Sequence, residues 1–192
     1  MPVTLQIESL AAGGDGVGHA DGQAVFVPRT APGDFVDVEL ESHGRFARGH
    51  VLAWRERSRD RVEPPCVHYV RDRCGGCQLQ HLNEQAQRKA KTAIVRDALL
   101  RIGKVTTAVS DVRPAPSPWR YRISLTLAIR RDSRGPTASW RFGLRDHADP
   151  ERVFDLEDCL ITDERVLGAW REIRAAAQLL PNAQRLRGTV RW

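Results

Sequence analysis

Three of the chain's four cysteines lie in one short stretch, and their spacing is that of a metal-binding loop. Cys66, Cys74 and Cys77 follow the pattern Cys-x7-Cys-x2-Cys, and Cys159 comes 82 positions later. A loop that supplies three thiolates and a distant segment that supplies the fourth can complete a four-thiolate site. The two glycines between the second and third cysteines allow the tight turn that this geometry needs. These residues could hold a [4Fe–4S] cluster or a structural zinc ion.

Other uses of these residues are less favoured. Nothing at the N-terminus reads as a secretory signal, and thiols in the cytoplasm stay reduced, so we do not expect disulfides. His68 and His81 lie beside the cysteines and could replace one of them as a zinc ligand. Four cysteines already complete the site, however, and we interpret both histidines as loop residues near it.

The motif around the cysteines resembles a known family. The run Cys-Gly-Gly-Cys-Gln-Leu-Gln-His at 74–81, a helix after it, Tyr-Arg at 121–122 and Asp-Cys at 158–159 are similar to the uracil-5-methyltransferases that modify ribosomal and transfer RNA. The resemblance implies that the four cysteines hold a [4Fe–4S] cluster. It also implies RNA as the partner and S-adenosylmethionine as the methyl donor of the full-length parent.

Composition points to a folded, basic protein. Hydrophobic residues make up 41% of the 192 positions, and the net charge of +6 rests almost wholly on arginine, since only three of the 30 basic residues are lysine. Residues 1–62 carry a net charge of −2 and residues 63–192 a net charge of +8. A basic second half suggests a polyanionic partner, although a solvated charged face is the alternative. No apolar run is long enough for a membrane span, so we expect a soluble protein with no membrane partner. We also expect it to be cytoplasmic and monomeric.

Residues 3–55 alternate apolar and polar positions in short segments separated by glycine turns, which predicts a small all-β barrel. The glycines at 13–18 read as turns between strands rather than as a phosphate loop, since no Gly-Lys-Ser/Thr follows them. The segment resembles a TRAM domain, an OB-like barrel that binds RNA. Barrels of this kind bind single strands with basic and aromatic side chains on one face. The candidates are Arg45, Phe46, Arg48 and Trp54, with a core role equally open for Trp54.

An arginine-rich linker at 55–61 leads to the cysteine loop, and a helix follows it. Asn83 is a good N-cap, and apolar residues recur on one face as far as Ile102, with Gly103 ending the helix. We therefore expect an amphipathic helix with a basic exposed side. Arg88 and Lys89 on that side are further candidates for contact with RNA.

The C-terminal part alternates like a sheet. Residues 119–129 predict a strand with Tyr121, Ile123 and three further apolar residues facing inward, and a turn is expected at 130–136. Segments 138–144 and 153–156 predict two more strands, which places Cys159 just beyond a strand end. Thr162 is expected to cap a helix running to about residue 180, and 187–192 reads as the start of another strand. By resemblance, Arg122 contacts RNA, although Ile123-Ser124 departs from the family pattern after it.

We therefore predict an α+β chain: a TRAM-like, OB-like small β-barrel at 1–60, then an α/β central domain at 61–192 with the iron–sulfur loop. All four cysteines are assigned to the metal, and no Gly-rich strand-turn-helix unit for a methyl donor is present. The expected function is the RNA-recognition half of an S-adenosylmethionine-dependent 23S rRNA or tRNA uracil-5-methyltransferase, truncated and with no catalytic residues of its own. The alternative is a stand-alone RNA-binding iron–sulfur or zinc protein.

Overall fold

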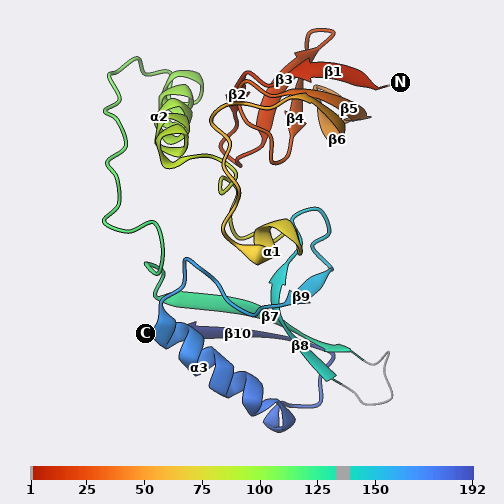
Figure 1. Cartoon of the computed structure of the whole chain (residues 1–192), viewed down its shortest axis with the longest axis vertical. Helices are drawn as coiled ribbons and strands as arrows, with labels where there is room; N and C mark the ends of the chain where they lie inside the picture. Colours follow the sequence, from red (N-terminus) through yellow and green to blue (C-terminus); the bar gives the residue numbers. More distant parts are fainter. Residues whose placement is uncertain (1, 133–138) are drawn as a thin grey trace. The chain divides into compact units, whose positions relative to one another are not determined.

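The computed structural model describes residues 2–132 and 139–192, and the chain forms two compact units that interleave in sequence (Figure 1). Unit 1 comprises Met1–Pro64 and Gln78–Pro114, and unit 2 comprises Pro65–Cys77 and Ala115–Trp192. The sequence predicts a single boundary after residue 60, whereas the structure groups the cysteine loop with the C-terminal residues. The helix that follows the loop belongs to unit 1.

Unit 1 is built on a six-stranded sheet with the order β1-β5-β6-β4-β3-β2. Its strands are β1 (Val3–Gln6), β2 (Ser9–Leu10), β3 (Gly16–Ala20), β4 (Gln23–Val27), β5 (Phe35–Ser42) and β6 (Phe46–Glu56). Alternate residues point into one core, as the period of two requires. The fully buried members are Leu5, Ile7, Val25, Val27, Val36, Val38 and Ala47.

The prediction of turns throughout residues 13–18 is wrong for the second half of that segment. Gly16 and Gly18 lie inside β3. A Cβ atom on Gly18 would stand 2.6 Å from the carbonyl oxygen of Gln6, and one on Gly16 would stand 2.0 Å from Oγ1 of Thr30. These glycines therefore allow β3 to approach its neighbours closely, which is a packing requirement rather than a turn signal.

The two ends of the cysteine loop are held side by side within unit 1. Asp34 is fully buried and accepts hydrogen bonds from the guanidinium group of Arg61, the shortest at 2.8 Å. The N–H of Val62 donates to the carbonyl of His81 at 3.0 Å, and Arg61 forms a β-bridge with Leu82. The segments on either side of the cysteine loop therefore pair with each other inside unit 1.

Helix α2 (Glu84–Arg101) begins where the sequence predicts, because the side chain of Asn83 accepts a hydrogen bond from the N–H of Ala86 at 2.8 Å. The predicted apolar face is confirmed only in the first half of the helix, where Ala86, Ala90 and Ile94 are half-buried, whereas Ala98 is exposed. Thr92 is the buried residue of this helix, and Ile102, just after it, is 84% exposed. The helix packs against β2, a strand of two residues, which is too short to cover a full helical face.

Unit 2 has a four-stranded antiparallel sheet with the order β10-β7-β8-β9, and α3 packs against one face of it (Figure 1). Its elements are α1 (Val67–Val70), β7 (Ser124–Asp132), β8 (Ser139–Arg145), β9 (Val153–Asp155), α3 (Glu164–Ala175), the 3-10 turn η1 (Ala177–Leu179) and β10 (Arg185–Arg191). The core includes Leu125, Leu127, Ile129, Phe142, Phe154, Leu156, Val166, Leu167 and Trp170.

Several predicted boundaries in unit 2 need correction. The strand expected from residue 119 begins at Ser124, so Tyr121 and Ile123 are 62% and 55% exposed rather than inward-facing. Asp163, not Thr162, caps α3 by accepting from the N–H of Arg165, and α3 ends at Ala175. The turn expected at 130–136 and the strand start at residue 138 fall largely on residues 133–138, outside the described residues.

No helix within the described ranges has the length and apolar character that crossing a bilayer requires. Together, the two sheets and their helices confirm the α+β class expected from the sequence.

Acid should destabilise unit 1 through His81. Burial lowers the pKa of His81 to about 4, against the opposing hydrogen bond to the carbonyl of Thr30. In the unfolded chain a histidine titrates near 6.5, so the unfolded state takes up the proton first, and stability falls as the pH drops from about 6.5 to about 4. We expect a loss of roughly 2–3 kcal/mol over this range, measured by urea unfolding at a series of pH values.

The control for this prediction is His50→Gln, since His50 is also in unit 1 but exposed. His81→Gln should flatten the acid limb of the stability curve and His50→Gln should leave it unchanged. Equal acid sensitivity in both variants would contradict the assignment to His81.

Candidate metal centre

The four cysteines all belong to unit 2, and all are free thiols. Cys74 is buried in the core of this unit, and Cys159 packs against the same core from the segment between β9 and α3. Cys66 and Cys77 are half-buried at either end of the loop. The structure thus groups the two sequence segments that the spacing predicts to act together.

The thiols lie close enough to act on one another electrostatically. The pKa of the Cys74 thiol is raised to about 11, mainly by burial and also by the charges of Cys77, Cys66 and Cys159, against a lowering by the N–H of Gly76. That N–H lies 3.4 Å from Sγ of Cys74. Four thiolates in such a place repel each other, and bound cations would relieve that repulsion and favour the deprotonated form.

The described residues do not include a group of three or more cysteine, histidine or acidic side chains placed to hold a single metal ion. Four thiols, one with an amide donor to its sulfur, are nevertheless the type of ligand set that iron–sulfur clusters and structural zinc use. In a cubane each thiolate binds its own iron, so the four sulfurs need not converge on one point. The residues present therefore fit such a group.

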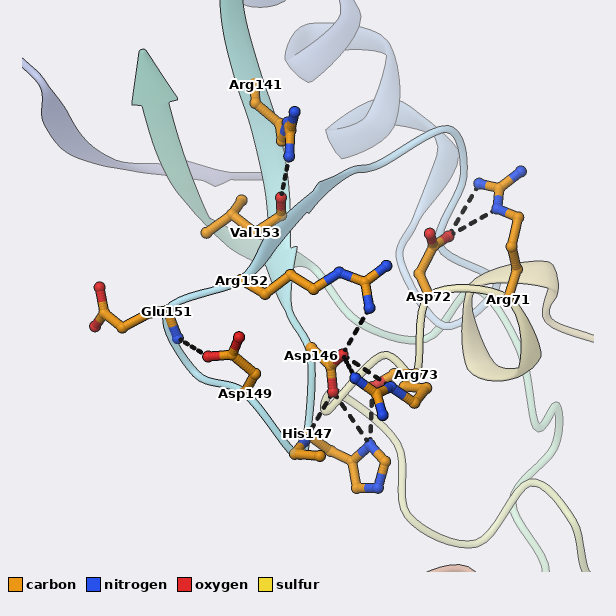
Figure 2. Close-up of polar contacts among 11 residues, drawn as sticks. Arg71, Asp72, Arg73, Arg141, Asp146, His147, Asp149, Glu151, Arg152 and Val153 are labelled. Carbon is orange, nitrogen blue, oxygen red and sulfur yellow. Dashed lines mark hydrogen bonds and ion pairs between the residues drawn. The ribbon is translucent and has the colours of Figure 1, made fainter. Parts of the chain in front are cut away.

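A buried carboxylate, Asp146, anchors the middle of the cysteine loop (Figure 2). The guanidinium of Arg73 donates to Asp146 Oδ2 at 2.9 and 2.6 Å, and Arg152 donates to the same oxygen at 3.1 Å. The N–H of Ala148 donates to Oδ1 at 2.8 Å. Burial raises the pKa of Asp146, but these donors outweigh it and leave the pKa below its usual value, so the carboxylate stays charged.

The backbone strengthens the same connection. The N–H of Gly75 donates to the carbonyl of Arg145 at 2.9 Å, and the N–H of His147 donates to the carbonyl of Arg73 at 2.9 Å. Arg73 has a φ of +51°, a left-handed conformation that costs a non-glycine residue free energy. The ion pair with Asp146 offsets this cost and sets the direction in which the chain enters Cys74.

His68 connects the start of the loop to the segment that carries Cys159. The N–H of Glu157 donates to Nε2 of His68 at 3.0 Å, so Nδ1 carries the ring proton and donates to Asp72 at 2.7 Å. Arg71 adds an ion pair of 2.7 Å to the carboxylate of Glu157. Both ring nitrogens of His68 are therefore engaged in holding the loop, and His81 lies in unit 1, where it bonds to Thr30.

Arg120 holds the fourth cysteine. Its guanidinium donates to both carboxylate oxygens of Asp158 at 2.9 Å and to the carbonyl of Cys159 at 2.9 Å. The hydrogen bonds from Arg120 lower the pKa of Asp158. Like Arg73, Arg120 has a left-handed backbone, with a φ of +57°. The sequence analysis did not identify Arg73, Arg120 or Asp146. The two arginines could have been found because Arg73 directly precedes Cys74 and Arg120 directly precedes Tyr121.

The residues predicted to contact RNA fall on both units. Phe46 begins β6 and Arg45 directly precedes it. The centre of the Phe46 ring lies 5.3 Å from that of His43, on which it stacks, and 5.6 Å from that of Phe26, which it meets edge-on. Arg48, on the same strand, is half exposed and lies 3.8 Å from Asp15. These side chains form a mixed aromatic and basic surface.

The remaining candidates are spread more widely. Arg88 and Lys89 lie on α2, where Arg88 pairs with Glu84 at 3.4 Å and Lys89 is exposed. Arg122 is exposed in unit 2. Trp54 is not a core residue: it is 36% exposed, and the guanidinium groups of Arg57 and Arg61 lie 5.1 and 4.3 Å from its ring centre.

Comparison with known proteins identifies the first unit's sheet. Residues 3–52 match the family model of the TRAM domain. The chain carries a TRAM domain. This segment spans β1 to β5 and most of β6, so the surface around Arg45 and Phe46 belongs to it.

Beyond the TRAM domain, the chain is homologous over most of its length to RNA methyltransferases. It is 35% identical, over 98% of its length, to an uncharacterized RNA methyltransferase of Halalkalibacterium halodurans, and covers 41% of that protein. It is 31% identical, over 83% of its length, to the 23S rRNA (uracil(1939)-C(5))-methyltransferase RlmD of Shewanella piezotolerans, covering 35% of it. The chain thus spans well under half the length of these relatives.

A solved structure shares the fold. The tRNA (uracil-54, C5)-methyltransferase of Pyrococcus abyssi, crystallised with S-adenosyl-L-homocysteine, superposes with a TM-score of 0.56 at 23% identity. The match covers 91% of this chain and 37% of that one. The TRAM domain and the α/β region after it therefore share their architecture with part of that enzyme.

Loss of the Asp146 carboxylate charge should loosen the cysteine loop even in metal-free protein. In Asp146→Asn the guanidinium of Arg73 loses its charged acceptor. Because Arg73 is half exposed, we expect this loss to cost about 1.5–3 kcal/mol, less than for a fully buried pair. We expect Cys74, which is only 7% exposed, to react with iodoacetamide at least about ten-fold faster than in the wild type. Mass spectrometry of the alkylated peptides measures this rate.

The matched control is Arg152→Gln, because Arg152 donates to the same carboxylate but lies outside the cysteine loop. This variant should leave Cys74 protected. Similar alkylation rates in the two variants would show that Asp146 stabilises unit 2 in general and does not anchor the loop.

Proposed function

We propose that this chain is the RNA-recognition part of an S-adenosylmethionine-dependent uracil-5-methyltransferase acting on 23S rRNA or tRNA. The observation that carries the proposal is the combination of a TRAM domain with homology to RNA methyltransferases over most of the chain. Two of the relatives named above are, by their names, uracil-C5 methyltransferases, one of 23S rRNA and one of tRNA.

We further propose that Cys66, Cys74, Cys77 and Cys159 hold a [4Fe–4S] cluster. Four neighbouring thiols match the need of a cubane for one cysteine at each iron. When bound, the cluster supplies four iron–sulfur bonds that cross-link the loop at 66–77 to the segment at 159. The role is structural, because an iron with all four ligand positions filled has no open site for chemistry.

The same assignment makes this part of the protein non-catalytic by itself. Covalent catalysis at uracil C6 needs a free thiolate as nucleophile, and all four cysteines of the chain lie in the proposed cluster site. Binding of the methyl donor and methyl transfer are accordingly assigned to the part of such enzymes that the chain does not span.

RNA binding is proposed to use both units. The edge strands β1 and β2 of the TRAM sheet are separated by only two residues, which supports closure into an OB-like barrel. On it, Arg45, Phe46 and Arg48 supply the aromatic and basic groups that bind single strands. Arg88 and Lys89 on α2, and Arg122 in unit 2, extend this set as phosphate contacts.

Metal content tests the cluster assignment. The anaerobically purified chain should be coloured and contain about four irons and four acid-labile sulfides per protein, because each thiolate takes one iron. Cys159→Ser should lower both numbers together with the melting temperature. A colourless protein with one zinc and no iron would contradict the cluster and favour the structural zinc site.

Base stacking on Phe46 tests the RNA-binding role of the TRAM domain. Phe46→Leu keeps an apolar side chain against Phe26 but removes the aromatic face, and stacking of one base contributes about 1–3 kcal/mol. We expect the affinity for single-stranded RNA to fall about ten-fold, measured by fluorescence anisotropy.

Leu52→Ala is the control, since Leu52 is an exposed apolar residue of the same strand. It should leave RNA affinity unchanged. Equal losses in the two variants, or none in Phe46→Leu, would argue against this surface as the stacking site.

A further inference from the structure

The face of the second sheet that points away from α3 is rich in arginine. On β7, Leu125, Leu127 and Ile129 are buried against α3, so the residues between them point to the opposite face. The same alternation holds on β10, where Leu186 and Val190 pack on the core, and on β8, where Phe142 does. The arginines on the outer face are Arg130, Arg141, Arg145, Arg185, Arg187 and Arg191.

Strand register places three of these arginines in one row across the sheet. Arg130 of β7 lies directly opposite Arg185 of β10 on one side and Arg141 of β8 on the other. Like charges at directly paired positions destabilise a sheet. The effect is visible at Arg130, whose pKa is lowered by burial and then by the charges of Arg145 and Arg185. The row concentrates positive charge, which Glu151 offsets in part through its ion pair with Arg185.

Glu151 is an acidic group that neutralises part of this face. Glu151 pairs with Arg185 at 3.0 Å and with Arg145 at 3.8 Å. Arg141 donates to the carbonyl of Val153 at 3.3 Å (Figure 2). Arg187 and Arg191 are exposed and form no ion pair with any residue in the ranges that the structure describes.

The residues between the arginines are small. Thr126 and Thr189 share a hydrogen bond of 2.9 Å across β7 and β10, and Ala128 stands opposite Arg187. Residues two apart on one strand are about 7 Å from each other, so the guanidinium groups are regularly spaced and the side chains between them are short. The face has no large apolar or aromatic residue of the kind that anchors a protein partner.

We propose that this arginine face binds the sugar-phosphate backbone of RNA, independently of base sequence. The proposal rests on the proposed function and adds a second binding surface, on unit 2, to the TRAM surface. Guanidinium groups bind phosphate oxygens through paired hydrogen bonds, and phosphates would relieve the repulsion within the row. Since no aromatic side chain on this face is available for stacking on bases, the contact positions the RNA backbone and does not distinguish base sequences.

The test measures binding of the full chain to 20-nucleotide oligouridylate and oligoadenylate as a function of salt. Arg187→Gln/Arg191→Gln removes two charges from the edge strand β10 without touching the core. The affinity for both oligonucleotides should fall by a similar factor of about ten, and the slope of log affinity against log salt should decrease by about 1.4. The control, Arg165→Gln/Arg171→Gln, removes two charges from α3, on the other side of the sheet, and should leave the slope unchanged.

A gain-of-binding variant guards against misfolding. Glu151→Gln removes the carboxylate that pairs with Arg185 and Arg145, and should tighten binding of both oligonucleotides roughly three-fold. A circular-dichroism spectrum equal to that of the wild type shows that the variant is folded. Unchanged binding in Glu151→Gln together with an unchanged salt slope in Arg187→Gln/Arg191→Gln overturns the proposal.

The remaining outcomes separate this proposal from the proposed function. If the wild type binds RNA and Phe46→Leu weakens it while the β10 variant does not, the arginine face fails and the RNA-binding function stands. If the wild type binds neither oligonucleotide, both fail. If the β10 variant loses binding to polyglutamate but not to RNA, the face serves an acidic protein and the proposal is overturned.

Discussion

The second unit depends on holding four cysteines from segments far apart in sequence close to one another. Burial raises the pKa of Cys74 to about 11, so this thiol stays protonated in the free chain, and the chain itself must hold the loop in place. It does so with polar contacts between segments far apart in sequence. Arg73 binds Asp146, His68 accepts from the N–H of Glu157, and Arg120 holds the carbonyl of Cys159.

Two of these contacts involve backbone strain beside a cysteine. Arg73 and Arg120 both have a left-handed φ. Arg73 directly precedes Cys74, and Arg120 donates a hydrogen bond to the carbonyl of Cys159. Strain of this kind persists where surrounding structure over-determines it, and it is concentrated at functional sites. Here the over-determination comes from a fully buried carboxylate on one side and from a bidentate ion pair with Asp158 on the other. The contacts that hold the cysteine segments therefore also hold the scaffold of unit 2 together.

The sequence predicted the features that depend on residues close together along the chain. The spacing of the cysteines, the N-cap at Asn83 and the alternation at 125–129 each depend on neighbouring residues, and the structure has the helix and the strand there. The interleaving of the two units was not predictable in this way, because it depends on pairing between Arg61 and Leu82 across the whole cysteine loop. Asp146 was missed for the same reason, since its partner Arg73 is 73 positions away.

The central claim is that Cys66, Cys74, Cys77 and Cys159 together bind a four-iron cluster. Anomalous scattering at the iron and zinc edges, recorded from crystals of anaerobically prepared protein, tests it most directly. The account predicts an iron signal of four atoms with one cysteine sulfur bonded to each. A single zinc atom bound by these cysteines, or an iron signal from which Cys159 is absent, would contradict it.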